Sequence, residues 1–165
     1  MIIVSDTTPI NYLVIIGEID LLEKLYGQVI VPQAVVRELN HPNTPLVVRN
    51  WMASPPNWIE IKSATAIDHT INLGAGETEA ISLAIELGAD QLLIDERKAR
   101  KGAVARGFVV AGTLNILEFG ARQELIDFPT VIAKLLQTTF RAPADLVQFL
   151  LDQDNLRKLA KQRSQ

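Results

Sequence analysis

The stretch GETEAISLAIELGADQLLID, residues 76–95, decides the fold class. Its apolar residues predict a buried helix from about Glu77 to Leu87 that Gly88 ends, because glycine favours the left-handed conformation found after helices. The run QLLID then predicts a short strand that ends at Asp95. A buried helix followed at once by a short apolar strand is typical of α/β proteins with a parallel sheet.

The same alternation continues on both sides of this stretch. Short β-branched runs predict strands at IIVS (2–5), QVIVP (28–32), WIEI (58–61) and FVVAG (108–112). Longer amphipathic runs predict helices at 9–16, 18–26, 32–40, 46–52, 97–106, 114–123, 129–139 and 144–159. Strands that alternate with helices are joined by right-handed crossovers, so we expect a parallel sheet with helices on both faces.

Length and composition set the domain organisation. With 165 residues, 48% of them hydrophobic, we expect a single domain over residues 1–160, with a core at 1–125 and C-terminal helices at 128–160, followed by a polar tail, 161–165, that frays. The absence of cysteine excludes disulfides, thiolate zinc sites and cysteine nucleophiles. The sequence shows neither a signal peptide nor an apolar run long enough to cross a membrane, so we expect a soluble cytoplasmic protein.

Two aspartates directly follow or end predicted strands. Asp6 follows IIVS, and Asp95 ends QLLID. The carboxyl ends of parallel strands lie at one edge of the sheet, where the ligand crevice of such folds is found. Two carboxylates brought close together there repel each other unless a proton or a cation intervenes. The alternative is that each aspartate caps the helix that follows it, because aspartate is a favoured N-cap residue.

Three glutamates on predicted helices are further candidate residues for this site. Glu38 lies at the edge of the apolar stripe of PQAVVRELN, where it is either a site residue or an ordinary solvated side chain. Glu77 and Glu79 lie in the first turn of the central helix, a position that also favours acidic residues through the helix dipole. The helix itself is almost entirely apolar, however, and buried carboxylates are rarely left without a partner.

A cluster of carboxylates without cysteine favours a hard cation. Such oxygen ligands select Mg²⁺ or Mn²⁺ over zinc. These ions polarise a phosphoryl oxygen and lower the pKa of a bound water, so the predicted chemistry is phosphodiester hydrolysis.

A basic segment follows Asp95 immediately. RKARKGAVAR, residues 97–106, carries five basic residues and no acidic one in a chain whose net charge is −3. We expect its first cations to contact the phosphates of a nucleic-acid substrate: Arg97, Lys98, Arg100 and Lys101. The alternative is an ordinary solvated helix face. With only 5% aromatic residues, an extended base-stacking platform is not expected.

Together these segments resemble a known family. The pattern IIVSDTTPI, VIVPQAVVREL, GAGETEAISLAIELGADQLLIDERKAR and FVVAGTLNIL, within residues 1–123, is similar to that of PIN-domain proteins of the VapC-like toxin type. The resemblance implies a three-layer α/β/α fold with a short central parallel sheet and an Mg²⁺- or Mn²⁺-dependent ribonuclease that acts as the toxin of a type II toxin–antitoxin pair. It also implies a homodimer and a cognate antitoxin protein as partner.

The resemblance also assigns roles to individual residues. It implies four catalytic acids, namely Asp6, Glu38, Glu77 and Asp95. Of these, Asp6, Glu77 and Asp95 are the expected metal ligands, and Glu38, Glu79 and Glu96 are further candidates. Thr7 matches the hydroxyl residue that holds a metal-bound water in this family.

Two other functions are compatible with parts of the sequence. One is a catalytically silent PIN-like module that acts through its binding surfaces. The other is a receiver-like or dehalogenase-like domain with an aspartyl phosphate, which is disfavoured because Asp6 is followed by Thr7 and Thr8 and not by a second acid. The phosphate-binding motif of P-loop proteins is absent.

Overall fold

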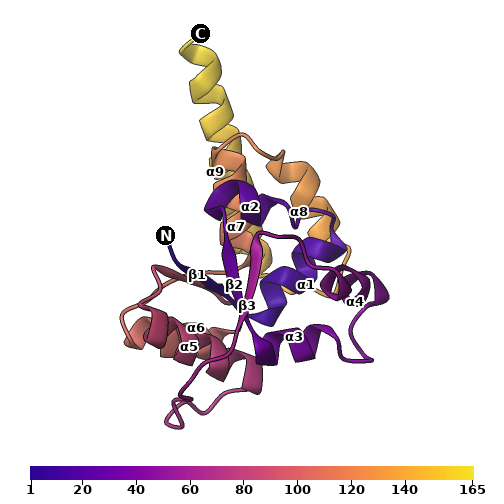
Figure 1. Cartoon of the computed structure of the whole chain (residues 1–165). Helices are drawn as coiled ribbons and strands as arrows, with labels where there is room; N and C mark the ends of the chain where they lie inside the picture. Colours follow the sequence, from indigo (N-terminus) through magenta and orange to yellow (C-terminus); the bar gives the residue numbers. More distant parts are fainter. The chain divides into compact units, whose positions relative to one another are not determined.

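The computed structural model describes residues 1–165 and contains a single five-stranded sheet (Figure 1). All strand pairs are parallel, and the strand order is β3-β2-β1-β4-β5. The strands are β1 (Ile3–Ser5), β2 (Val29–Pro32), β3 (Ile59–Lys62), β4 (Gln91–Leu93) and β5 (Val109–Ala111). The predicted α/β fold class, a parallel sheet flanked by helices, is confirmed.

The strand order places a switch point beside the central strand. From β1 the chain builds β2 and then β3 on one side, and it then crosses over to build β4 and β5 on the other side of β1. Ser5 of β1 pairs with Leu93 of β4, so the carboxyl ends of these two strands lie next to each other. In open parallel sheets, ligands bind in the crevice outside such a switch point.

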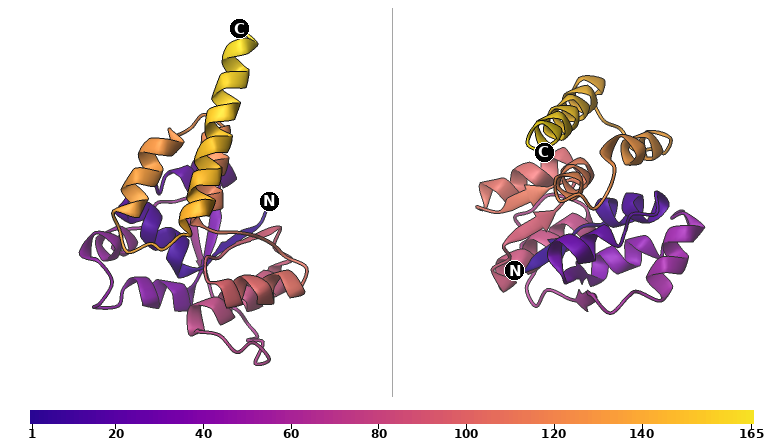
Figure 2. Two further views of the ribbon diagram at one scale, coloured as in Figure 1. Left: turned by 180° about the vertical axis from the view of Figure 1, so that it is seen from behind. Right: turned by 90° about the horizontal axis from the view of Figure 1, so that it is seen from above.

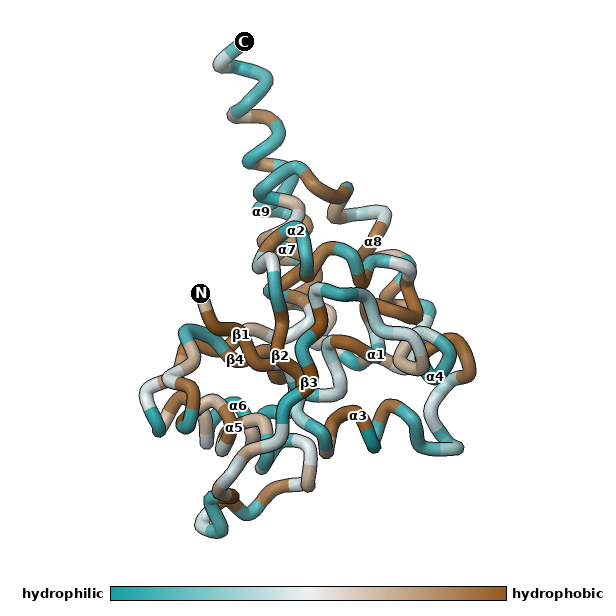
Figure 3. Tube along the Cα trace, viewed as in Figure 1, coloured by the Kyte–Doolittle hydropathy of each residue, from teal (hydrophilic) through white to brown (hydrophobic).

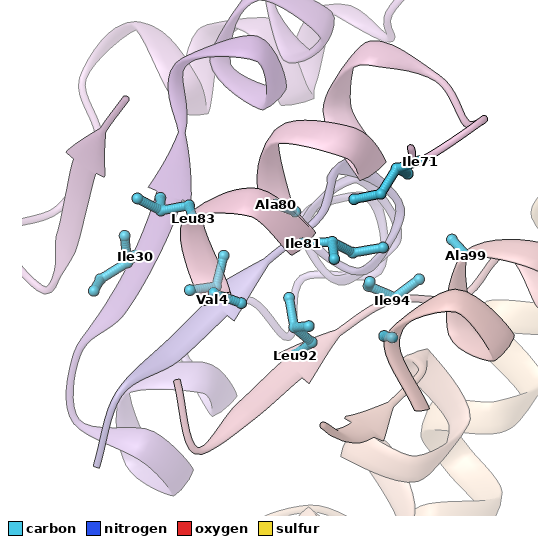
Figure 4. Packing of buried hydrophobic residues seen from close by; sticks show 11 residues of the cluster. Val4, Ile30, Ile71, Ala80, Ile81, Leu83, Leu92, Ile94 and Ala99 are labelled. Atoms are coloured by element: carbon cyan, nitrogen blue, oxygen red, sulfur yellow. The ribbon is translucent and has the colours of Figure 1, made fainter. Parts of the chain in front are cut away.

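The core on one face of the sheet joins three strands to two helices. Val4, Ile30 and Leu92 pack against α5 (Ala75–Leu87) and α6 (Arg97–Ala105), as Figure 4 shows. Their neighbours on the same strands are also buried, for example Ile3, Val29 and Leu93. β1, β2 and β4 are therefore largely apolar on both sides, which is typical of parallel sheets, and they are largely brown in Figure 3.

Four further helices complete the first part of the chain (Figures 1 and 2). Their bounds are α1 (Thr7–Ile15), α2 (Leu21–Tyr26), α3 (Gln33–Leu39) and α4 (Leu46–Ala53). Three of these four helix starts differ from the prediction, and α2 begins at Leu21, three residues after the predicted start. α1 begins directly after Asp6, two residues before the predicted start, and α3 begins after Pro32, which is the last residue of β2. Pro32 stays extended, with ψ of 151°, because it pairs with Lys62 of β3.

The chain divides into two compact units, residues 1–113 and 114–165. The second unit contains most of α7 (Thr113–Arg122), together with α8 (Phe128–Leu136) and α9 (Ala144–Arg163). In this unit the buried Asp154 forms ion pairs with Arg157 and Lys158. α9 continues past its predicted end into the expected polar tail, because the added residues, largely lysine, glutamine and arginine, are good helix formers. The division into a core of 1–125 and later helices stays a prediction. No helix is both long and apolar enough to span a bilayer.

Candidate active site

Asp6 lies at the carboxyl end of the central strand, beside the end of β4. Its backbone N–H donates to the carbonyl of Leu93 at 2.9 Å, which fixes it at the switch point. Only 2% of the residue is exposed, and its Oδ1 is buried without a hydrogen-bond partner in the protein. Asp6 occupies the N-cap position of α1, but its side chain makes no capping hydrogen bond. Helix capping therefore does not account for the burial of the Asp6 carboxylate.

The charge state of Asp6 reflects this burial. Loss of hydration raises the pKa of Asp6 to about 7, although the backbone N–H of Thr7 lowers it. The negative charges of Glu77, Glu38 and Asp95 raise it further. The other three acids expected from the sequence therefore lie close enough to Asp6 to raise its pKa.

Asp95 is held by hydrogen bonds from the end of β5. Its Oδ1 accepts from the backbone N–H of Thr113 at 2.8 Å, and its Oδ2 accepts from the Thr113 hydroxyl at 2.6 Å. Burial raises the pKa of Asp95, while these bonds and the charge of Arg100 lower it. A β-carbon on Gly112 would lie 2.7 Å from Asp95 Oδ1, so only glycine leaves room for the carboxylate in this position. Asp95 does not cap α6; that role belongs to Glu96.

Glu38 is held between the starts of two helices. Its Oε2 accepts a short hydrogen bond from the Thr7 hydroxyl, and its Oε1 accepts from the backbone N–H of Gly76 at 2.9 Å. A β-carbon on Gly76 would lie 2.6–2.9 Å from this carboxylate. Glu38 is thus a fixed, half-buried site residue and not a freely solvated one.

Glu77 lies in the first turn of α5, and its carboxylate lies close to Gly74. Burial raises the pKa of Glu77, backbone N–H groups at the helix start lower it, and the charges of Glu38 and Glu96 raise it further. Glu77 is consequently linked to Asp6, Glu38 and Glu96 by electrostatic repulsion. Such a cluster of partly buried acids is stabilised by a cation.

The two additional candidate ligands already have backbone partners. The oxygens of buried Glu79 accept from the backbone N–H groups of Ala34 at 2.6 Å and Ala64 at 3.0 Å. Oε2 of Glu96 accepts from the backbone N–H of Ala99 at 2.7 Å and caps α6. The carboxylates of Glu79 and Glu96 therefore have structural roles, and of the two candidate ligands on α5, Glu77 and Glu79, Glu77 is the better placed.

One cation of α6 lies against the acidic cluster. The guanidinium of Arg100 donates to the carbonyl of Ile94 at 3.1 Å and lowers the pKa of neighbouring Asp95. Arg97, Lys98 and Lys101 are exposed on the same helix. Their predicted contacts with RNA phosphates stay a prediction.

The donor set fits a hard divalent cation, but it does not form a closed cage. No three aspartate, glutamate or histidine side chains converge closely enough to enclose an ion on their own. Mg²⁺ is commonly bound by one or two carboxylates, with water and substrate phosphate as the remaining ligands. The unpartnered Oδ1 of Asp6, surrounded by acidic residues, is the oxygen that such an ion would satisfy.

Comparison with protein families shows which family the chain belongs to. A family model described as a PIN domain, DUF3368, matches residues 2–155. The chain belongs to the PIN-domain family. PIN domains are typically nucleases, and PIN nucleases generally use divalent metal ions. No curated protein and no solved structure matches the chain.

Three residues of this PIN domain support the acids without having been singled out in the sequence. Gly76 and Gly112 give room for the carboxylates of Glu38 and Asp95, and Thr113 binds Asp95. The sequence contained a signal for two of them, because Gly112 is the last residue of a predicted strand and Thr113 directly follows it, which places both at the same sheet edge as the acids.

Proposed function

We propose that this PIN domain is an Mg²⁺- or Mn²⁺-dependent endoribonuclease. The observation that carries the proposal is the buried, unpartnered Oδ1 of Asp6 among Glu38, Glu77 and Asp95 at the switch point of the sheet. Membership of a family whose members are typically nucleases supports it. We further propose the VapC-like role: the toxin of a toxin–antitoxin pair, acting as a homodimer that a cognate antitoxin inhibits.

Each acid has a task in this proposal. Asp6 would bind the cation, with Asp95 and Glu77 contributing directly or through bound water, and Glu38, which Thr7 and Gly76 hold in place, would orient water beside it. The bound ion supplies Lewis-acid stabilisation of the phosphoryl oxygen and a water of lowered pKa. Arg100 lies beside Asp95 and offers a positive charge to the substrate phosphate. The oxygen of the attacking water forms a bond to phosphorus while one ester bond from phosphorus to oxygen breaks, and the departing oxygen takes up a proton to become a hydroxyl. Hydrolysis therefore does not need the 2′-hydroxyl of the substrate.

Incubation of the purified protein with end-labelled single-stranded and structured RNAs tests this function. We expect cleavage with Mn²⁺, and no cleavage when a chelator replaces the metal. Replacing the ribose at a mapped cleavage position by deoxyribose is expected to leave cleavage there, because water is the nucleophile.

Two outcomes would overturn the proposal. Cleavage that persists in the chelator, or that yields 2′,3′-cyclic phosphates, would exclude metal-assisted hydrolysis. Absence of cleavage of every RNA, by folded protein with Mn²⁺, would favour a PIN module that acts by binding alone.

A further inference from the structure

A pocket adjoins the acidic site at Glu38. Its volume is about 360 Å³, and it is a shallow hollow that opens widely to solvent. The residues that line it come from α1, from the end of α3 and from the loop that follows α3: Asn11, Glu38, His41, Asn43, Thr44 and Pro45. Because Glu38 belongs to both, a group in the pocket would lie next to a phosphate in the acidic site.

The loop that forms the pocket is tied to α3. The carbonyl of Glu38 accepts from the His41 backbone N–H at 3.1 Å and from the Thr44 hydroxyl at 2.8 Å. The carbonyl of Thr44 in turn accepts from Nε of Arg49 at 3.0 Å. These bonds order the loop before any ligand binds, and preorganisation of this kind reduces the entropic cost of binding.

The lining chemistry excludes a phosphate and favours a neutral ring. None of the six lining residues is lysine or arginine, and Glu38 adds negative charge, so a phosphate would be repelled. The amides of Asn11 and Asn43 each offer both donors and an acceptor, as the edges of nucleobases require.

His41 adds a defined donor to this set. Its Nδ1 accepts from the backbone N–H of Asn43 at 3.0 Å. The neutral imidazole therefore carries its proton on Nε2, which is left to donate to a ligand. Pro45 provides an apolar ring surface in the same pocket.

We propose that this pocket binds one nucleobase of single-stranded RNA, adjacent to the cleaved phosphate, and sets the base preference of cleavage. The role of the pocket in cleavage rests on the proposed nuclease function, whereas base binding by the pocket does not. A single strand is required because the bases of a duplex are stacked and paired, and are not free to enter a side pocket.

Sequencing of cleavage sites in a randomised single-stranded RNA pool tests the proposal. The wild-type protein is expected to favour one base, or a pair of related bases, at a fixed position beside the cut. Asn11→Ala and Asn43→Ala should each reduce that preference by about tenfold, since a well-formed amide–base contact discriminates by at least this factor. Asn50→Ala, an exposed asparagine of α4 outside the pocket, is the matched control and should keep the wild-type preference.

The outcomes distinguish a failure of base recognition by the pocket from a failure of the nuclease function. Cleavage without base preference, or a preference unchanged in both pocket variants, overturns the proposal although the nuclease function stands. If the wild type cleaves no RNA, the nuclease function fails, and the pocket is tested by adding the four nucleosides while the NMR signals of the Asn43 and Thr44 backbone amides are followed. Shifts with at least one nucleoside that Asn11→Ala abolishes support base binding; no shift with any nucleoside overturns it.

Discussion

Asp6→Asn is expected to lower Mn²⁺-dependent RNA cleavage by about 10³-fold or more. Asparagine keeps the shape of the side chain but removes its charge, and the transition-state stabilisation from a bound metal is on the order of several kcal/mol. Glu23→Gln, a change of the same kind at an exposed residue of α2, should leave cleavage unchanged.

The same substitution is expected to stabilise the metal-free protein at high pH. The carboxyl of Asp6 ionises at about pH 7 in the folded chain, against 3.8 ordinarily. Because the folded state binds this proton more tightly than the unfolded state does, the free energy of unfolding falls as pH rises from about 4 to 7 and stays lower above pH 7. At about 1.4 kcal/mol per pKa unit, the penalty at pH 8 is on the order of 4 kcal/mol, and Asp6→Asn removes it.

Thermal unfolding in a chelator at pH 5 and pH 8 measures this effect. Asp6→Asn should unfold at a higher temperature than the wild type at pH 8, and the difference should shrink at pH 5. A variant that is less stable than the wild type at both pH values would contradict the view that Asp6 is strained by burial and by neighbouring acids. Glu23→Gln should show no such dependence on pH.

Gly76→Ala is expected to lower RNA cleavage by about 10²-fold with little loss of stability. The added β-carbon would lie 2.6–2.9 Å from the carboxylate of Glu38, which must therefore move away from its bond to the backbone N–H of residue 76. A displacement of about 1 Å in a catalytic group typically costs this much. Alanine is also the better helix former by about 0.5–1 kcal/mol, which offsets the lost hydrogen bond.

Gly102→Ala is the matched control for this substitution. Gly102 also lies within a helix, but a β-carbon there would meet its nearest neighbouring atom at 3.8 Å, an ordinary contact distance. Unfolding temperature and cleavage rate are measured for both variants. Gly102→Ala should be active and slightly more stable than the wild type. RNA cleavage by Gly76→Ala at the wild-type rate would show that catalysis does not depend on the position of the Glu38 carboxylate.

The sequence predicted the sheet and its acidic edge because both depend on local patterns. Short apolar runs ending in Asp6 and Asp95 indicate strands and their carboxyl ends, and the strand order then brings the two ends together. The supports of the acids depend on contacts between distant segments. The bond from the backbone N–H of Gly76 to Glu38, for example, spans 38 residues and leaves no periodic signal.

The choice between Glu77 and Glu79 shows the same limit. Both glutamates open one helix, and the pattern alone does not separate them. Two residues correspond to a rotation of about 200° around a helix, so the two side chains lie on nearly opposite faces. Glu79 meets the backbone of Ala34 and Ala64, whereas Glu77 is coupled electrostatically to Asp6.

Binding of Mn²⁺, measured by isothermal titration calorimetry on the wild type and on Asp6→Asn at pH 7.5, tests the central claim most directly. A cation held at the switch point by Asp6 and its neighbouring acids predicts binding to the wild-type protein that weakens at least tenfold in the variant. Glu23→Gln should bind as the wild type does. Equal Mn²⁺ affinity of Asp6→Asn and the wild type would contradict the account.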